Sequence, residues 1–136
     1  MNIQDRLGYQ FRNADLLTLA LTHSSKGKPC NEQLEFLGDT VLSLVTAERL
    51  TVAGAWKVPE GVLAVNKARL CSNDNLYRIA LEIRLGDYLL LGRGEECSGG
   101  RTKKNILADG IEALIGAVYL DGGINAAKSV VDRLVR

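Results

Sequence analysis

Acidic side chains are concentrated in two segments of the sequence that contain no lysine or arginine. The first segment covers residues 31–39 and carries Glu32, Glu35 and Asp39. The second covers residues 105–127, in which the only charged residues are Asp109, Glu112 and Asp121. Protein surfaces usually interleave charges of both signs, so two purely acidic segments are unusual. Because carboxylate oxygens without His or Cys are the ligands of hard ions, these segments are candidates for binding Mg²⁺ or Mn²⁺.

Helical spacing places the acids of each segment on one face. At about 100° per residue, the acids of the first segment fall within about 60° of one another. The opposite face is apolar and contains Leu34, Leu37, Val41, Leu44 and Val45. In the second segment Asp109 and Glu112 share a face, opposite Leu107, Ile111, Leu114 and Val118. On spacing alone, the simpler interpretation of both faces is the solvated side of an amphipathic helix.

Two glycines favour a more specific interpretation. Gly38 and Gly116 lie inside the predicted helices, beside the carboxylates, although glycine costs a helix roughly 1 kcal/mol relative to alanine. A residue without a side chain allows another part of the molecule to approach closely. If the two helices are neighbours, their carboxylates converge, and either raised pKa values or a metal ion must compensate. A Mg²⁺ site of this kind binds phosphate oxygens, and cleavage of a phosphodiester bond is the expected chemistry.

Basic residues precede the second acidic segment. Arg101, Lys103 and Lys104 follow the Gly99-Gly100 bend, and residues 57–104 hold nine Lys and Arg against six Asp and Glu. Cations beside an acidic metal site can hold a polyanion over it, although a solvated charged loop is the alternative.

The remaining pattern predicts a single all-α domain of 136 residues, with apolar residues at three- and four-residue steps. Asn13, Pro59 and Ser72 are suited to helix starts. We expect helices over residues 14–21, 31–52, 59–70, 72–82, 102–120 and 125–136, with a long glycine-rich loop over 86–100 and a break at 121–123.

Composition excludes several other classes of protein. The net charge is +1, and the three cysteines are too dispersed for a zinc site, so we expect reduced thiols in a cytoplasmic protein. No stretch approaches the ~20 apolar residues of a membrane span. We expect no membrane partner and no nucleotide cofactor. Aromatic residues are only 5%, which does not support a stacking platform for single strands.

Residues 31–39, Asn-Glu-Gln-Leu-Glu-Phe-Leu-Gly-Asp, resemble the signature segment of the ribonuclease III family. Segments 21–24, 92–100 and 106–116 agree with the family in order and spacing, so the resemblance covers nearly the whole chain. It implies the all-helical ribonuclease III endonuclease domain, acting as a homodimer that cuts double-stranded RNA with Mg²⁺, for which Mn²⁺ can substitute. Short 3′ overhangs and a role in rRNA and mRNA precursor processing are implied as well.

The resemblance also assigns roles to individual residues. The implied metal ligands are Glu35, Asp39, Asp109 and Glu112, of which Asp39 and Glu112 are the candidate catalytic residues. Glu32 matches an acidic residue associated with RNA processing, and Glu60 one near the dimer interface. Phe36 projects on the acidic side of its helix, where a second protomer would cover it. For RNA contacts we expect Arg93, Arg101, Lys103 and Lys104, and we interpret residues 1–136 as a catalytic domain without a double-stranded-RNA-binding domain.

Two other functions are compatible with the same fold. One is a non-catalytic RNA-binding or ribosome-associated relative, which would typically lack some of the carboxylates. The other is a helical dimerisation module, which would leave the acidic faces unexplained. His23, the only histidine, is expected to cap or pack at the end of a helix rather than to act as a general base.

Overall fold

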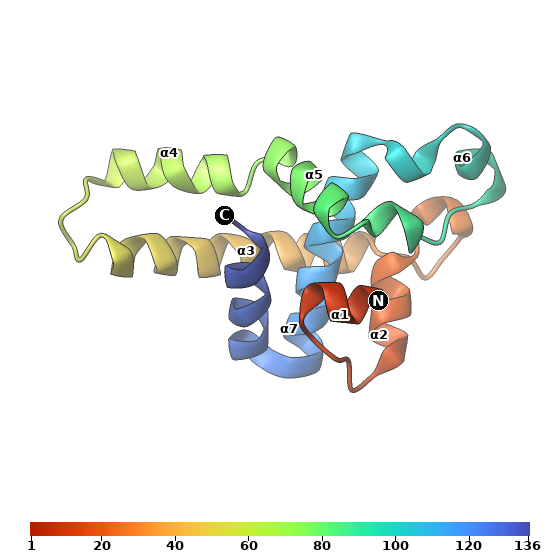
Figure 1. Cartoon of the computed structure of the whole chain (residues 1–136), viewed down its shortest axis with the longest axis horizontal. Helices are drawn as coiled ribbons and strands as arrows, with labels where there is room; N and C mark the ends of the chain where they lie inside the picture. Colours follow the sequence, from red (N-terminus) through yellow and green to blue (C-terminus); the bar gives the residue numbers. More distant parts are fainter.

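The computed structural model describes residues 1–136, and it is helical without a named strand (Figure 1). The α-helices are α1 (Ile3–Leu7), α2 (Ala14–Leu21), α3 (Glu32–Ala53), α4 (Glu60–Leu70), α5 (Asn73–Glu82), α6 (Arg93–Cys97) and α7 (Lys104–Leu134). Three 3₁₀ turns join them, η1 (Ser24–Lys26), η2 (Leu85–Asp87) and η3 (Gly100–Thr102). The predicted all-α class is confirmed. No helix combines the length and apolarity needed to cross a bilayer.

Several helix boundaries follow directly from capping residues. The side chain of Asn13 accepts a hydrogen bond from the backbone N–H of Asp15 at 3.0 Å, at the start of α2. Ser72 caps α5 in the same way, through the N–H of Asn75 at 3.1 Å. Gly54 ends α3. These caps satisfy backbone groups that the helix itself leaves free, and they place the boundaries close to the predicted ones.

The structure differs from the prediction at three places. The helix α1 was not predicted, and it is held by a capping box between Asn2 and Asp5. The predicted loop 86–100 contains α6 and parts of η2 and η3. The break at 121–123 is present as a kink inside α7, where Gly123 adopts φ 85° and ψ −177°. The final part of the chain, dark blue in Figure 1, turns back after this kink.

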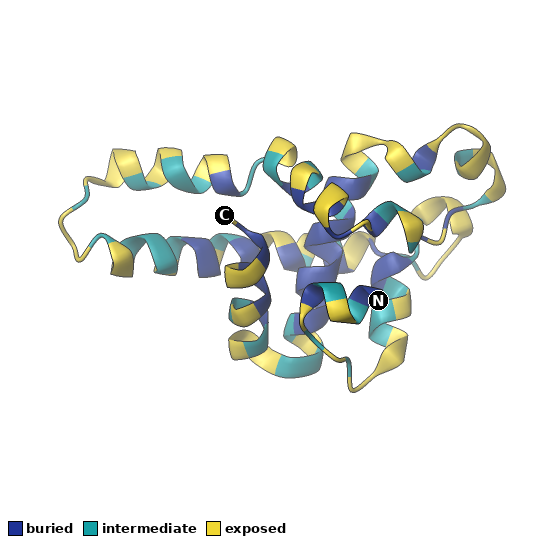
Figure 2. Ribbon diagram, viewed as in Figure 1, coloured by how far each residue is buried: buried dark blue, intermediate teal, exposed yellow.

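The core is organised around α7. Helices α2, α3 and α5 pack against it, and residues 107–118 are buried around almost the whole circumference except at Asp109 (Figure 2). The stripe of α3 that α7 covers contains Leu34, Gly38, Val41, Leu42 and Val45. Leu44 was expected on the packed face and is exposed, because it lies at the margin of this stripe.

The second half of α3 and all of α4 extend from the body as a long hairpin (Figure 1). Its side chains are mostly exposed or half-buried (Figure 2). Large apolar residues remain in water along it, including Val52, Trp56, Val62 and Val65. An exposed apolar surface of this kind is typical of an interaction face.

Candidate active site

The helices α3 and α7 contact each other through their backbones at two glycines. A Cβ atom on Gly38 would overlap the carbonyl oxygen of Glu112, and one on Gly116 would overlap the carbonyl oxygen of Leu34. Any larger residue would therefore push the helices apart. The two glycines of the sequence pattern have a structural reason, which is to bring the acidic faces of these helices together.

A polar cavity of about 720 Å³ lies beside this crossing. All four predicted metal ligands line it, and so does Glu32. The other polar side chains at its surface are His23, Ser24, Asn31 and Asn73. The structure thus joins the two acidic segments into a single site.

Three of the carboxylates are close enough to share one ion. Glu35, Asp109 and Glu112 each offer an oxygen atom, and these atoms lie within 4.8 Å of one another. Asp39 lies next to Glu112 on the same cavity. The third acid of the second segment is not part of the site, because Asp121 accepts hydrogen bonds from the Tyr9 hydroxyl and the backbone of residues 12 and 13.

Burial raises the pKa values of Glu35, Asp109 and Glu112, and repulsion by neighbouring carboxylates adds to the rise at Glu35 and Glu112. Glu112 is only 9% exposed. Burial, together with the neighbouring Asp39, raises its pKa to about 8. Burial and Asp109 raise the pKa of Glu35 to about 7. Burial also raises the pKa of Asp109, although its hydrogen bond with Glu35 opposes the rise. The same hydrogen bond adds to the rise in the pKa of Glu35.

Such a set of groups fits a divalent cation. Burial disfavours the ionised forms of Glu35, Asp109 and Glu112, and a bound cation would favour them. All of the donors are oxygen atoms, which hard ions prefer. Glu35, Asp109 and Glu112 consequently have the donor chemistry and the spacing of a divalent metal site.

The four polar residues His23, Ser24, Asn31 and Asn73 were not predicted to lie at the cavity, and hydrogen bonds hold the side chains of two of them, Asn31 and His23. Asn31 is buried, and its amide donates a hydrogen bond to the carbonyl oxygen of Ala20 at 3.1 Å. His23 was expected to cap or pack, and its Nδ1 atom does accept the backbone N–H of Ser25 at 3.1 Å, but the residue also lines the cavity. Both residues precede α3 in segments whose approach to α7 depends on tertiary structure, so helical periodicity could not locate them.

Comparison with known proteins assigns the chain to a family. A family model described as Ribonuclease-III-like matches residues 13–136, most of the chain. The chain belongs to the ribonuclease III family. The acidic cavity at the α3–α7 crossing therefore lies within a chain of this nuclease family.

Named relatives agree over almost the same residues. The chain is 49% identical over 132 residues to Ribonuclease 3 from Aromatoleum aromaticum, and also 49% identical over 132 residues to that from Variovorax paradoxus. Each alignment covers 97% of this chain and 58% of the relative, so the chain spans somewhat more than half the length of these curated proteins. The crystal structure of the ribonuclease III nuclease domain from Campylobacter jejuni matches with a TM-score of 0.92 and 43% identity, covering 97% of this chain and 90% of that one.

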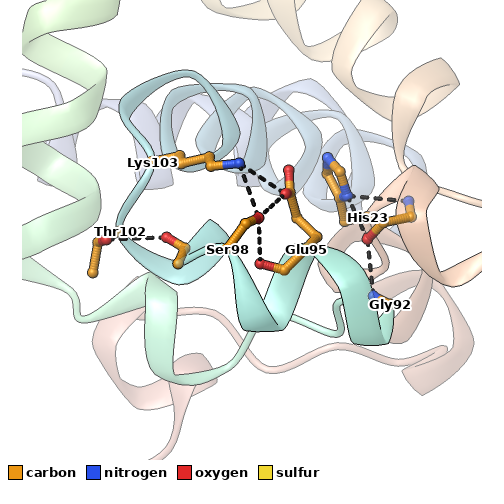
Figure 3. Close-up of polar contacts among 8 residues, drawn as sticks. His23, Gly92, Glu95, Ser98, Thr102 and Lys103 are labelled. Carbon is orange, nitrogen blue, oxygen red and sulfur yellow. Dashed lines mark hydrogen bonds and ion pairs between the residues drawn. The ribbon is translucent and has the colours of Figure 1, made fainter.

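Of the four basic residues predicted to contact RNA in this ribonuclease III domain, three bond to other parts of the protein. Arg101 donates hydrogen bonds to Glu96 at 2.6 Å and to the carbonyl oxygens of residues 86 and 89. Lys103 bonds to Glu95 at 2.8 Å and to Ser98 at 3.2 Å (Figure 3). Lys104 pairs with Asp74. Arg93 is exposed and has no side-chain bond.

These partners separate the four cations by role. The guanidinium of Arg101 holds the backbone between η2 and α6, which is a structural task. Lys103 and Lys104 must release a carboxylate before they can bind another anion. Arg93 needs no such release.

The two residues expected at a dimer interface lie on different parts of the ribonuclease III domain. Phe36 is 79% exposed at the edge of the acidic cavity, as its helix position predicted. Glu60 begins α4 and lines a groove between the arms of the α3–α4 hairpin. Glu60 does not line the acidic cavity of its own chain.

Proposed function

We propose that this chain is a Mg²⁺-dependent endoribonuclease that hydrolyses phosphodiester bonds in double-stranded RNA. One observation carries the proposal. A chain of the ribonuclease III family retains four carboxylates, Glu35, Asp39, Asp109 and Glu112, around one cavity. Its expected role is the processing of rRNA and mRNA precursors in the cytoplasm, where its free thiols stay reduced.

In this proposal Glu35, Asp109 and Glu112 hold the divalent ion, and Asp39 completes the acidic wall next to Glu112. Mn²⁺ can replace Mg²⁺, because both accept oxygen ligands. When bound, the ion supplies an activated water and stabilises the departing 3′ oxygen. The side chains need not form a covalent intermediate. Their tasks are to orient the ion and to balance its charge with their own.

The proposed active form is a homodimer. Phe36 exposes a large aromatic ring, which is costly for a monomer in water. On the same chain, an apolar groove of about 460 Å³ is lined by Leu16, Leu19, Leu34, Leu37 and Leu120, among others. We propose that Phe36 of each protomer enters this groove on its partner. A related Campylobacter jejuni structure is described by its flexibility in the region involved in dimer formation.

Two active sites in one dimer can cut both strands, which gives short 3′ overhangs if the cuts are staggered. Proteins recognise A-form RNA through its shape, its phosphates and its 2′-hydroxyl groups. We therefore expect little sequence preference. Four residues that are not metal ligands have proposed roles as well. The cations Arg93, Lys103 and Lys104 contact the RNA, and Glu32 contributes to its processing.

The decisive experiment is cleavage of duplex RNA by the purified chain with Mg²⁺, with EDTA as the control. Glu112→Gln removes one ligand and one negative charge, so this variant should bind duplex RNA but scarcely cleave it. The matched control is Glu48→Gln on α3, which changes an exposed carboxylate outside the cavity. Binding without cleavage by the wild-type chain would favour the non-catalytic RNA-binding alternative, and full activity of Glu112→Gln would refute the proposed site.

A further inference from the structure

Two hydrogen bonds at the ring atom Nδ1 and one at the backbone N–H tie His23 to neighbouring residues. The ring atom Nδ1 accepts the backbone N–H of Ser25 at 3.1 Å and lies 2.8 Å from the Ser25 hydroxyl oxygen. That hydroxyl oxygen accepts the N–H of Gly92 at 2.8 Å. The backbone N–H of His23 donates to the carbonyl oxygen of Leu90 at 3.0 Å. The histidine is thus tied to the segment that leads into α6.

These bonds determine which ring nitrogen carries the proton. The Ser25 oxygen already accepts a hydrogen bond from Gly92, so its own hydrogen is free to point at Nδ1. Two donors directed at Nδ1 make this atom an acceptor. In the neutral ring the proton is then on Nε2. Nε2 has no hydrogen-bond partner within the protein, and Figure 3 shows it on the side of the ring away from Gly92.

The segment that carries His23 is also packed tightly. A Cβ atom on Gly92 would overlap the carbonyl oxygen of Ser25, so the turn after α2 and the start of α6 lie in direct contact. Because the ring is anchored by a neighbouring segment as well as by its own turn, its orientation is fixed before any ligand arrives. A donor held in this way loses little entropy when it forms a new bond.

The surroundings of His23 indicate what kind of ligand its free N–H would meet. His23 lines the acidic cavity together with Glu35, Asp109 and Glu112. On its other side it lies close to Glu95, which binds Lys103 (Figure 3).

We propose that His23 is a substrate-binding residue, whose Nε2–H donates a hydrogen bond to a phosphate oxygen of RNA held over the carboxylate cluster. The inference rests on the proposed function and adds a phosphate-binding residue that is not one of the acids. The bond would position the phosphate without any proton transfer by the ring. Its alternative is a structural one, in which His23 only caps η1 through Nδ1.

Two amide substitutions separate these roles. In His23→Asn the amide can still accept the Ser25 N–H, since asparagine is a good capping residue, but nothing occupies the position of Nε2. In His23→Gln the longer side chain can bring its NH₂ group to that position. We expect His23→Gln to keep cleavage of a short duplex RNA within a few-fold of wild type. His23→Asn should lose roughly 10- to 100-fold in kcat/KM, the usual scale for one hydrogen bond to a charged group.

Two further measurements distinguish the proposed role of His23 from an effect on folding and from the proposed function. Thermal unfolding of His23→Asn should match wild type, so that its loss of activity is not a loss of structure. Binding of the same duplex in Ca²⁺ should be weaker for His23→Asn than for His23→Gln, and this readout needs no cleavage. Wild-type cleavage and binding by His23→Asn, or equal losses in both variants, would overturn the role of Nε2. Absence of cleavage by the wild-type chain, with RNA binding still sensitive to His23→Asn, would instead refute only the proposed function.

Discussion

Replacing Glu112 with glutamine should stabilise the metal-free protein at alkaline pH. The folded state raises the pKa of Glu112 from 4.5 to about 8, mainly through burial. Between pH 4.5 and about pH 8, the Glu112 carboxyl group therefore binds more protons in the folded state than in the unfolded state. The free energy of unfolding therefore falls as the pH rises through this window. Glu35, whose pKa is raised to about 7, acts in the same direction.

The size of the effect follows from linkage. One pKa unit corresponds to about 1.4 kcal/mol, so ionising Glu112 at pH ~8 costs the folded state up to about 4 kcal/mol. Glutamine removes this cost, but its amide needs hydrogen-bond partners at a position that is only 9% exposed. We therefore expect a net gain of about 2 kcal/mol, or a Tm higher by roughly 8 °C for a domain of this size.

Thermal unfolding in EDTA, followed by circular dichroism at several pH values, measures this gain. The Tm difference between Glu112→Gln and wild type should be largest at pH ~8 and should shrink towards pH ~4.5, where the unfolded carboxyl group is also protonated. Adding Mg²⁺ at pH ~8 should raise the Tm of wild type and scarcely change that of the variant. Glu48→Gln, at an exposed position, should show neither effect. A Tm difference that is absent or independent of pH would refute the argument from burial.

Three other outcomes test separate parts of the structure. Phe36→Ala should weaken dimerisation by roughly 2 to 4 kcal/mol in sedimentation equilibrium; a wild-type chain that is monomeric at micromolar concentration would contradict this. Gly116→Ala forces α3 and α7 apart and should lower the free energy of unfolding by about 2 kcal/mol. Gly94→Ala should not lower it, because a Cβ at that position meets open space. Equal denaturation curves for the two variants would count against close packing of α3 on α7 at Gly116. Neutralising Lys103 and Lys104 should weaken binding to all duplexes alike and reduce the salt slope by about 0.9 for each phosphate that the protein no longer neutralises. An unchanged slope would remove these lysines from the RNA interface.

Much of the helical framework was predictable from the sequence, because its signals are local. Apolar residues at three- and four-residue steps depend only on the geometry of one helix. Caps such as Asn13 and Ser72 act on N–H groups two or three residues away. The family signature in residues 31–39 is likewise a continuous segment. Short helices escaped prediction, since α1 and α6 contain too few residues to show a period.

The acidic site was only partly predictable. The sequence shows carboxylates and a glycine on each of two helices, but it leaves open whether these faces contact solvent or each other. In isolation Glu112 belongs to the polar side of an amphipathic helix, yet it is buried because α3 covers α7 at that point. Its raised pKa is a consequence of this packing, and no local pattern reports it.

The sequence alone thus determined the all-α class, the residues of the acidic faces, the two glycines and the family resemblance, since each is a property of neighbouring residues. Only the tertiary structure decided which charged groups meet. Arg101 was expected to hold RNA, and the structure shows its guanidinium bonded to residues 86, 89 and 96. His23 was expected to be a cap, and the residue also lines the cavity. The physical reason is that a side chain's partners across space depend on how distant helices pack, whereas its helix and its face depend on the few residues around it.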